Sequence, residues 1–157
     1  MTLHEFNALS DNEARDVMLT VCGSTSWSDQ MVMARPFASV SDVVAKGEHI
    51  WTHTGPADWE EAFAAHPRIG EQSASHFSSE EQKLTEDERV AAELARLNDL
   101  YYKRNGFIFI VFATGKTPLE MLEILQSRLD NDGNVEMSIA AAEQLKILKL
   151  RLQKLFA

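Results

Sequence analysis

The chain has little cysteine, no excess of basic charge and no long apolar run, and each shortage argues against a class of protein. Its 157 residues include one cysteine, Cys22, so no internal disulfide can form and no thiolate cluster is available for zinc. Formal net charge is −9, from 24 acidic against 15 basic residues, which argues against a nucleic-acid partner. The longest apolar run, FIFIVFA, is far too short to cross a bilayer.

The composition itself is ordinary for a globular protein, with 45% hydrophobic and 25% charged residues. A chain of this length favours one domain and can bury about two-thirds of its unfolded surface, so it needs neither a metal nor a disulfide to fold. The first twenty residues lack the basic and apolar regions of a secretory signal, and the terminal KLFA differs from a peroxisomal SKL address. We expect a single domain over residues 1–157, located in the cytoplasm.

A helix-start signal recurs along the sequence: a Ser or Thr followed three residues later by Glu, whose side chains satisfy free N–H groups at a helix start. The pairs are Thr2 and Glu5, Ser10 and Glu13, Ser78 and Glu81, Thr85 and Glu88, and Thr117 and Glu120. Pro118 stands at a first helical position, where its missing N–H costs nothing. Gly23 and Gly106 are placed to close two of these helices.

Apolar spacing predicts further helices. Apolar residues recur with helical period in 39–55 and 56–65, and the last helix carries a leucine stripe. The members of this stripe are Leu145, Leu148, Leu152 and Leu155. No repeat of 20 to 50 residues and no low-complexity linker is present. The sequence predicts an all-α single domain of about eight helices.

One segment differs from this pattern: GFIFIVFATG, residues 106–115, is rich in aromatic and β-branched residues between glycines. By itself it resembles a buried strand, but no second strand of similar strength exists to pair with it. A buried, unpaired, extended segment would leave backbone N–H and C=O groups without partners. Two explanations are open. The segment is a buried part of the core, in helical or extended conformation, or it is extended near residues 107–113 and its backbone faces a ligand.

Familiar catalytic and metal motifs are missing. The sequence contains no nucleophile elbow, phosphate-binding loop or dinucleotide fingerprint. His49 and His53 have the spacing of metal ligands on a helix but no clear third ligand, so we assign no metal site. Cys22 lies near a helix end among apolar residues and is better explained as a buried structural thiol than as a nucleophile.

Three polar sites could carry chemistry, and each also has a structural explanation. His66, in AAHPRIGE, precedes Pro67, which disfavours the α region before it, so the imidazole is either aimed by this boundary or simply lies at a helix end. Ser78 and Glu81 form a capping box by themselves. Arg151 is either a ligand contact or a solvated charge on the last helix. Taken singly, each site is explained adequately by its structural role.

Together these pieces follow the order and approximate spacing of a known family. The family's His-Pro signature resembles HPRIG, and its Ser-x-x-Glu-Gln motif resembles SSEEQ. Its block from Leu-Asn to Phe-x-Phe resembles LNDLYYKRNGFIFIVFATGKT, and its terminal Leu-Arg-Leu resembles LKLRL. The chain resembles, over nearly its whole length, bacterial-type 2-oxo-4-hydroxy-4-carboxy-5-ureidoimidazoline (OHCU) decarboxylases. The resemblance implies an all-helical, metal-free and cofactor-free enzyme of urate degradation that converts OHCU to (S)-allantoin, and it favours a homodimer.

The resemblance also implies site residues. His66 is the implied acid/base, with Glu81 and Arg151 as further catalytic groups. The implied substrate contacts are Pro67, Ser78, Ser79, Glu80 and Gln82, and the stretch Phe109, Ile110, Val111, Phe112 and Ala113 through its backbone. Arg68, Ile69 and Ile108 depart from the family's usual residues and bear on fine substrate placement. The alternative is a helical module that binds a ureide or purine-derived ligand without turnover.

Overall fold

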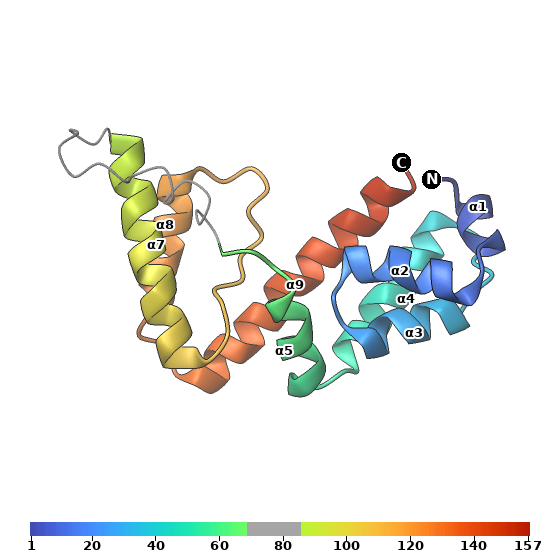
Figure 1. Ribbon diagram of the computed structural model, residues 1–157, viewed down its shortest axis with the longest axis horizontal. Helices are drawn as coiled ribbons and strands as arrows, with labels where there is room; N and C mark the ends of the chain where they lie inside the picture. Colours follow the sequence, from blue (N-terminus) through green and yellow to red (C-terminus); the bar gives the residue numbers. More distant parts are fainter. Residues whose placement is uncertain (69–85) are drawn as a thin grey trace. The chain divides into compact units, whose positions relative to one another are not determined.

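The computed structural model describes residues 1–68 and 86–157. Within these ranges the chain forms eight α-helices and no strand (Figure 1), which confirms the predicted all-α fold. The helices are α1 Leu3–Ala8, α2 Asp11–Val21, α3 Thr25–Met33, α4 Val40–Thr52, α5 Pro56–Ala64, α7 Glu86–Asn105, α8 Pro118–Arg128 and α9 Gly133–Leu155. The helix start predicted at Ser78 lies outside the described residues. No helix in the described ranges is both long and apolar enough to cross a membrane.

Side-chain caps begin several of these helices, as predicted. The hydroxyl of Thr2 accepts a hydrogen bond from the amide of Glu5 at 3.1 Å, and complete capping boxes open α2 and α8. Ser24 and Ser39 cap α3 and α4 in the same way, although no Glu follows three residues later. A search for Ser or Thr paired with Glu therefore misses caps that use the hydroxyl alone.

The chain divides into two compact units. Unit 1 comprises Met1–Ala65 and Ala141–Ala157, and unit 2 comprises His66–Ala140. Helix α9 contributes its first part to unit 2 and the remainder to unit 1. The single domain expected over residues 1–157 stays a prediction.

In unit 1, the second part of α9 packs through the predicted leucine stripe. Leu148 and Leu152 are fully buried. The indole Nε1 of Trp51, on α4, donates a hydrogen bond to the carbonyl oxygen of Ala141 at 2.9 Å. Gly47 allows close approach of the same helices, because a Cβ there would lie 2.9 Å from Leu152 Cδ1. Burial of the apolar face thus fixes α9 against α4.

The two glycines predicted to close helices serve different purposes. Gly106 follows α7 with φ of +80°, a left-handed conformation that glycine adopts at little cost. Helix α2 ends at Val21, and its C-cap, Cys22, is extended. Gly23 is instead required for packing, because a Cβ there would lie only 2.5 Å from the Cβ of Ala65.

In unit 2, α7 packs along α8 (Figure 1), and the connection between them, residues 106–117, is buried at Phe107 and from Phe109 to Val111. The segment 107–113 is neither helix nor strand. The ring of Tyr101 makes edge contacts with those of Phe107 and Phe109, with ring centroids 5.9 and 5.6 Å apart. The helical alternative for this segment is therefore wrong: Phe107 and Phe109 pack against Tyr101 of α7 from a backbone that is not helical.

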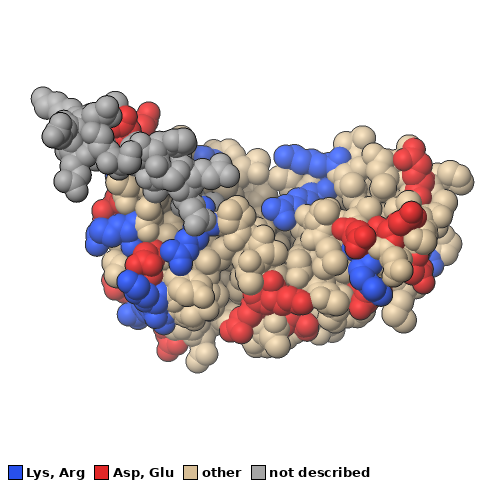
Figure 2. All heavy atoms as spheres, in the orientation of Figure 1, with Lys and Arg blue, Asp and Glu red and all other residues tan. Residues whose placement is uncertain are grey.

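On the face drawn in Figure 2, Lys and Arg side chains are mixed with Asp and Glu on both units. On this face, the two signs of charge are not separated into one acidic and one basic region.

Candidate active site

His66 stands where the sequence predicts it, just beyond a helix end. Helix α5 ends at Ala64, Ala65 is its C-cap, and the half-buried His66 follows. Pro67 is exposed. The prediction that the helix stops just before the His-Pro pair is confirmed, and it follows from the contact between the proline ring and the preceding residue.

Arg68, one of the departures from the family's usual residues, attaches the chain after His66 to helix α7. Its guanidinium carbon lies 5.0 Å from the ring centroid of Tyr102, and its Nη1 lies 3.6 Å from Oδ1 of Asp99. A cation over an aromatic face and beside a carboxylate is held by both contacts. These contacts restrict the backbone two residues after His66.

Five predicted site residues fall outside the described residues, so their roles stay predictions. They are Ser78, Ser79, Glu80, Glu81 and Gln82.

The predicted backbone contacts lie on the non-helical segment of unit 2. Phe109, Ile110 and Val111 are buried, with exposed fractions of 1%, 3% and 4%. Phe112 and Ala113 are half-buried. Within residues 1–68 and 86–157, the amides of Phe109, Ile110 and Val111 donate to no backbone or side-chain acceptor. Amides in buried residues are nearly always paired, so these donors are available to a ligand.

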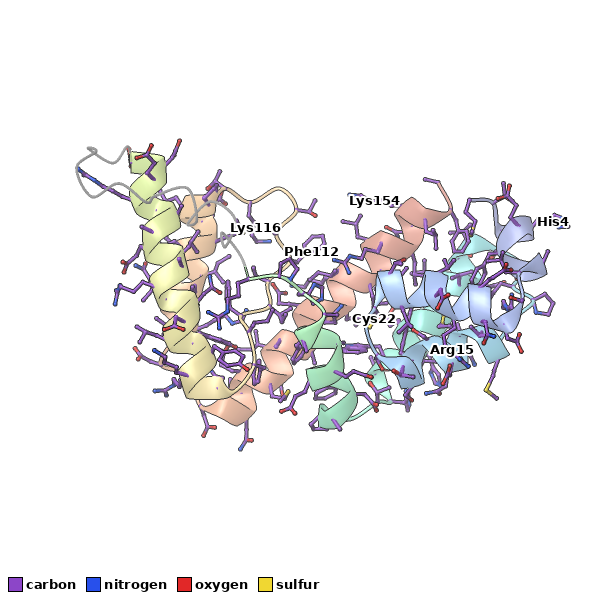
Figure 3. All side chains as sticks on the ribbon, viewed as in Figure 1. His4, Arg15, Cys22, Phe112, Lys116 and Lys154 are labelled. Carbon is purple, nitrogen blue, oxygen red and sulfur yellow. The ribbon has the colours of Figure 1, made fainter. Side chains whose placement is uncertain are left out.

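Two cationic side chains hold carbonyl groups of this segment. Arg128 Nη1 donates a hydrogen bond to the carbonyl oxygen of Ile110 at 2.6 Å. Lys116 Nζ donates to the carbonyl oxygen of Phe112 at 2.7 Å and lies 5.4 Å from the centre of the Phe112 ring (Figure 3). The carbonyl groups of Ile110 and Phe112 are thus both held by side-chain cations. Sequence reasoning missed both cations, because charged residues at helix ends and in loops usually face solvent.

Arg151, on the part of α9 that belongs to unit 1, is exposed, and its Nη1 donates to the carbonyl oxygen of Val21 at 3.1 Å. The structure gives its other guanidinium N–H groups no acceptor among the described residues. Arg151 is therefore anchored by one donor, and the other N–H groups of its planar fork have no acceptor among the described residues. His66, Pro67 and the 109–113 segment belong to unit 2.

Cys22 is a buried structural thiol, as predicted. It is 1% exposed, and burial raises its pKa to about 12, against a lowering by the Ser24 backbone hydrogen bond and by the charge of Arg151. The thiol therefore stays protonated at neutral pH, where only the thiolate would be a nucleophile.

His49 and His53 lie together at the end of α4, with ring centroids 4.2 Å apart. The ring Nδ1 of His53 is within 2.7 Å of the carbonyl oxygen of His49 and donates to it. Among the described residues, no group of three or more His, Cys, Asp or Glu side chains is placed to hold a metal ion.

Comparison with known proteins decides the family. The model of the OHCU decarboxylase family matches residues 7–153. The chain belongs to this family. A solved structure described as OHCU decarboxylase in the presence of (S)-allantoin is 36% identical, with a TM-score of 0.77 over 94% of this chain and 99% of that one.

Two curated relatives that differ in length are similar to this chain. The uric acid degradation bifunctional protein TTL of Arabidopsis thaliana is 39% identical over 147 residues, which cover 87% of this chain and 45% of that protein. The OHCU decarboxylase of Haloferax volcanii is 25% identical over 163 residues, covering all of this chain and 97% of that one. The chain thus spans less than half the length of the Arabidopsis thaliana protein and nearly the whole length of the Haloferax volcanii protein.

Proposed function

We propose that this chain decarboxylates OHCU to (S)-allantoin in urate degradation, in the cytoplasm and without metal or cofactor. The observation that carries the proposal is the family match over residues 7–153. The position of His66 directly after α5 and the available amides of the buried segment support it. We also propose a homodimer, which light scattering on the purified protein would test.

The substrate can supply its own electron sink. Its carboxylate is on a ring carbon that also carries a hydroxyl and lies next to a C=N bond. When the bond to the carboxylate breaks, CO₂ leaves and the electron pair forms a C=C bond while the C=N nitrogen takes up a proton. The resulting enol loses its hydroxyl proton and gains one on the carbon bearing the ureido group. The protein must orient the substrate, move protons and select one face.

His66 is the proposed acid/base for these proton transfers. An imidazole has an ordinary pKa near 6.5, so at neutral pH it can both accept the hydroxyl proton and return a proton to carbon. Its place between a helix end and Pro67 restricts the backbone that carries the ring. We propose that Glu81 binds the ring or ureido N–H groups and that Ser78, Ser79, Glu80, Gln82 and Pro67 complete the pocket.

Arg151 and the buried segment are proposed to bind substrate oxygens. Arg151 keeps guanidinium donors beyond the one that binds Val21, and a planar fork suits a carbonyl or carboxylate. The amides of Phe109, Ile110 and Val111 are N–H donors, and with Phe112 and Ala113 they form the proposed backbone contact to a flat ureide. Both interactions orient the substrate so that the departing carboxylate can turn out of the ring plane.

Circular dichroism tests the proposal. OHCU is generated in situ from urate with a uricase and a hydroxyisourate hydrolase, with and without this protein. Spontaneous decay yields racemic allantoin and no lasting signal, whereas the proposed enzyme produces the (S)-allantoin signal rapidly. A folded sample that leaves the decay rate and the racemic outcome unchanged would overturn the proposal and favour a binding module.

A further inference from the structure

We propose that Arg128 and Glu136 form a buried ionic clamp that positions segment 107–113 to receive the substrate. The inference rests on the proposed function, because it assigns a role in substrate binding to residues outside the predicted site. Arg128 acts through the backbone it holds, so it is a positioning residue rather than a catalytic one.

The clamp is a buried and well-satisfied ion pair. Arg128 is the last residue of α8 and Glu136 lies in the first turn of α9, and their side chains are 7% and 0% exposed. Arg128 Nε donates to Glu136 Oε1 at 2.8 Å. The hydroxyl of Tyr101 donates to the same oxygen at 2.6 Å, and Asn131 Nδ2 donates to Oε2 at 2.8 Å. Both carboxylate oxygens therefore have partners.

Tyr101 remains a hydrogen-bond donor over the working range of pH. Burial, followed by its hydrogen bond to Glu136, raises the pKa of its hydroxyl well above the usual value. The carboxylate of Glu136 thus keeps a neutral donor as well as the guanidinium, and the position of Arg128 is fixed from one side.

On its other side, Arg128 holds the segment. Its Nη1 donates to the carbonyl oxygen of Ile110 at 2.6 Å, and its guanidinium carbon lies 4.7 Å from the centre of the Phe109 ring. One planar group thus contacts two consecutive residues whose amides are available to a ligand. Because Glu136 fixes the guanidinium, it also fixes Ile110 and the amides on either side of its carbonyl.

Stability alone is a weak reason for such a pair. Burying two charges costs desolvation free energy, and replacing a buried ion pair by apolar side chains of similar size is often neutral or stabilising. Removing one partner is strongly destabilising, because the other charge stays buried. A positioning role therefore predicts that an apolar replacement preserves the fold but loses substrate affinity, whereas a purely structural role predicts that both are preserved together.

The test is a triple variant, Arg128→Met with Glu136→Leu and Tyr101→Phe, which removes both charges and the hydroxyl that would otherwise lose its partner. We expect the triple variant to unfold at a higher temperature than Arg128→Met alone, because it leaves no buried charge and only the Ile110 carbonyl and the Asn131 amide lose partners. Arg128→Met alone should lower the thermal midpoint by more than about 6 °C. For OHCU turnover, we expect KM to rise about tenfold or more with a smaller change in kcat. The matched control replaces the ion pair of unit 1, Glu48→Gln with Lys149→Met, and should leave KM unchanged.

Backbone amide chemical shifts of Phe109, Ile110 and Val111 in the unliganded protein give a readout that needs no activity. The clamp predicts that these shifts move in the triple variant and stay in place in the control. Arg128→Lys is the second variant should the triple variant fail to fold, because a single ammonium cannot span Glu136 and Ile110 as the guanidinium does. Wild-type KM and unmoved shifts in a folded variant would overturn the clamp. If the wild-type protein does not turn over OHCU, the proposed function is refuted, and the amide chemical shifts of the triple variant alone test the clamp.

Discussion

The guanidinium of Arg151 donates a hydrogen bond of 3.1 Å to the carbonyl oxygen of Val21, the last residue of α2. Carbonyl groups in the last turn of a helix have no partner within the helix. Arg151 satisfies one of them with a single N–H and retains its other donors. The contact therefore fixes the direction of the guanidinium without using its capacity to bind an oxygen ligand.

Arg151→Lys should reduce kcat/KM for OHCU by about 10- to 100-fold, because an ammonium cannot match the planar fork that binds Val21 and an oxygen ligand together. Stability should change by no more than about 0.5 kcal/mol, since the side chain is exposed. Steady-state kinetics and thermal unfolding measure the two effects. Lys154→Met, which removes an exposed charge on the same helix, is the control and should leave turnover unchanged. Full activity in the lysine variant would remove Arg151 from the site.

Cys22 should be unreactive toward a disulfide reagent such as DTNB in the folded protein at pH 8 and should react fully in urea. It is 1% exposed, and its thiolate is disfavoured by burial. The measurement is the absorbance of the released thiolate with time. Rapid labelling of the folded protein would contradict the burial of this thiol.

The same thiol should make the protein less stable in alkali. Because the folded pKa is raised from 9.0 to about 12, the folded state retains a proton that the unfolded state loses. Its contribution to stability is complete below pH 9 and is lost as pH rises toward 12. Urea unfolding midpoints measured from pH 8 to 11 should fall less steeply in Cys22→Ala than in the wild type. Parallel curves would show that Cys22 does not contribute.

Features set by neighbours in sequence could be predicted from the sequence, and features set by distant contacts could not. The caps at Ser10 and Thr117 and the glycine after α7 follow from residues within one turn. Segment 107–113 was recognisable as unusual, but its conformation depends on packing against α7. The burial of Arg128 depends on Glu136 and Ile110, which no local pattern connects to it.

In the candidate site, too, local features could be predicted from the sequence and features set by distant contacts could not. The helix end before His66 is a local effect of Pro67, so the sequence locates it correctly. The anchoring of Arg151 to Val21 joins residues 130 positions apart, and the sequence gives no sign of it. Family resemblance predicts site residues from distant parts of the chain, and these stay predictions, whereas periodicity and spacing describe only single elements.

Gly23→Ala should destabilise the protein by about 1–3 kcal/mol, because the new Cβ would lie 2.5 Å from the Cβ of Ala65. Chemical denaturation measures the loss. Adding Ala65→Gly removes the opposing methyl group and should restore most of the lost stability. Gly133→Ala is the control: its Cβ would make an ordinary contact of 3.8 Å at the start of α9, so the protein should be unchanged or up to about 1 kcal/mol more stable. A harmless Gly23→Ala would mean that the connection between α2 and α3 is packed less closely against the end of α5.

His66→Asn should lower kcat by at least about 100-fold, because asparagine can hydrogen-bond but cannot exchange a proton near neutral pH. Allantoin that does form should be racemic, since protonation of the enol would then occur in solvent. The measurements are the decay of OHCU absorbance and the circular dichroism of the product, with a thermal midpoint to confirm the fold. His4→Asn, an exposed histidine in α1, is the matched control and should behave as the wild type. Stereospecific product formed at the normal rate by His66→Asn would refute the acid/base role and leave His66 as a helix-end residue.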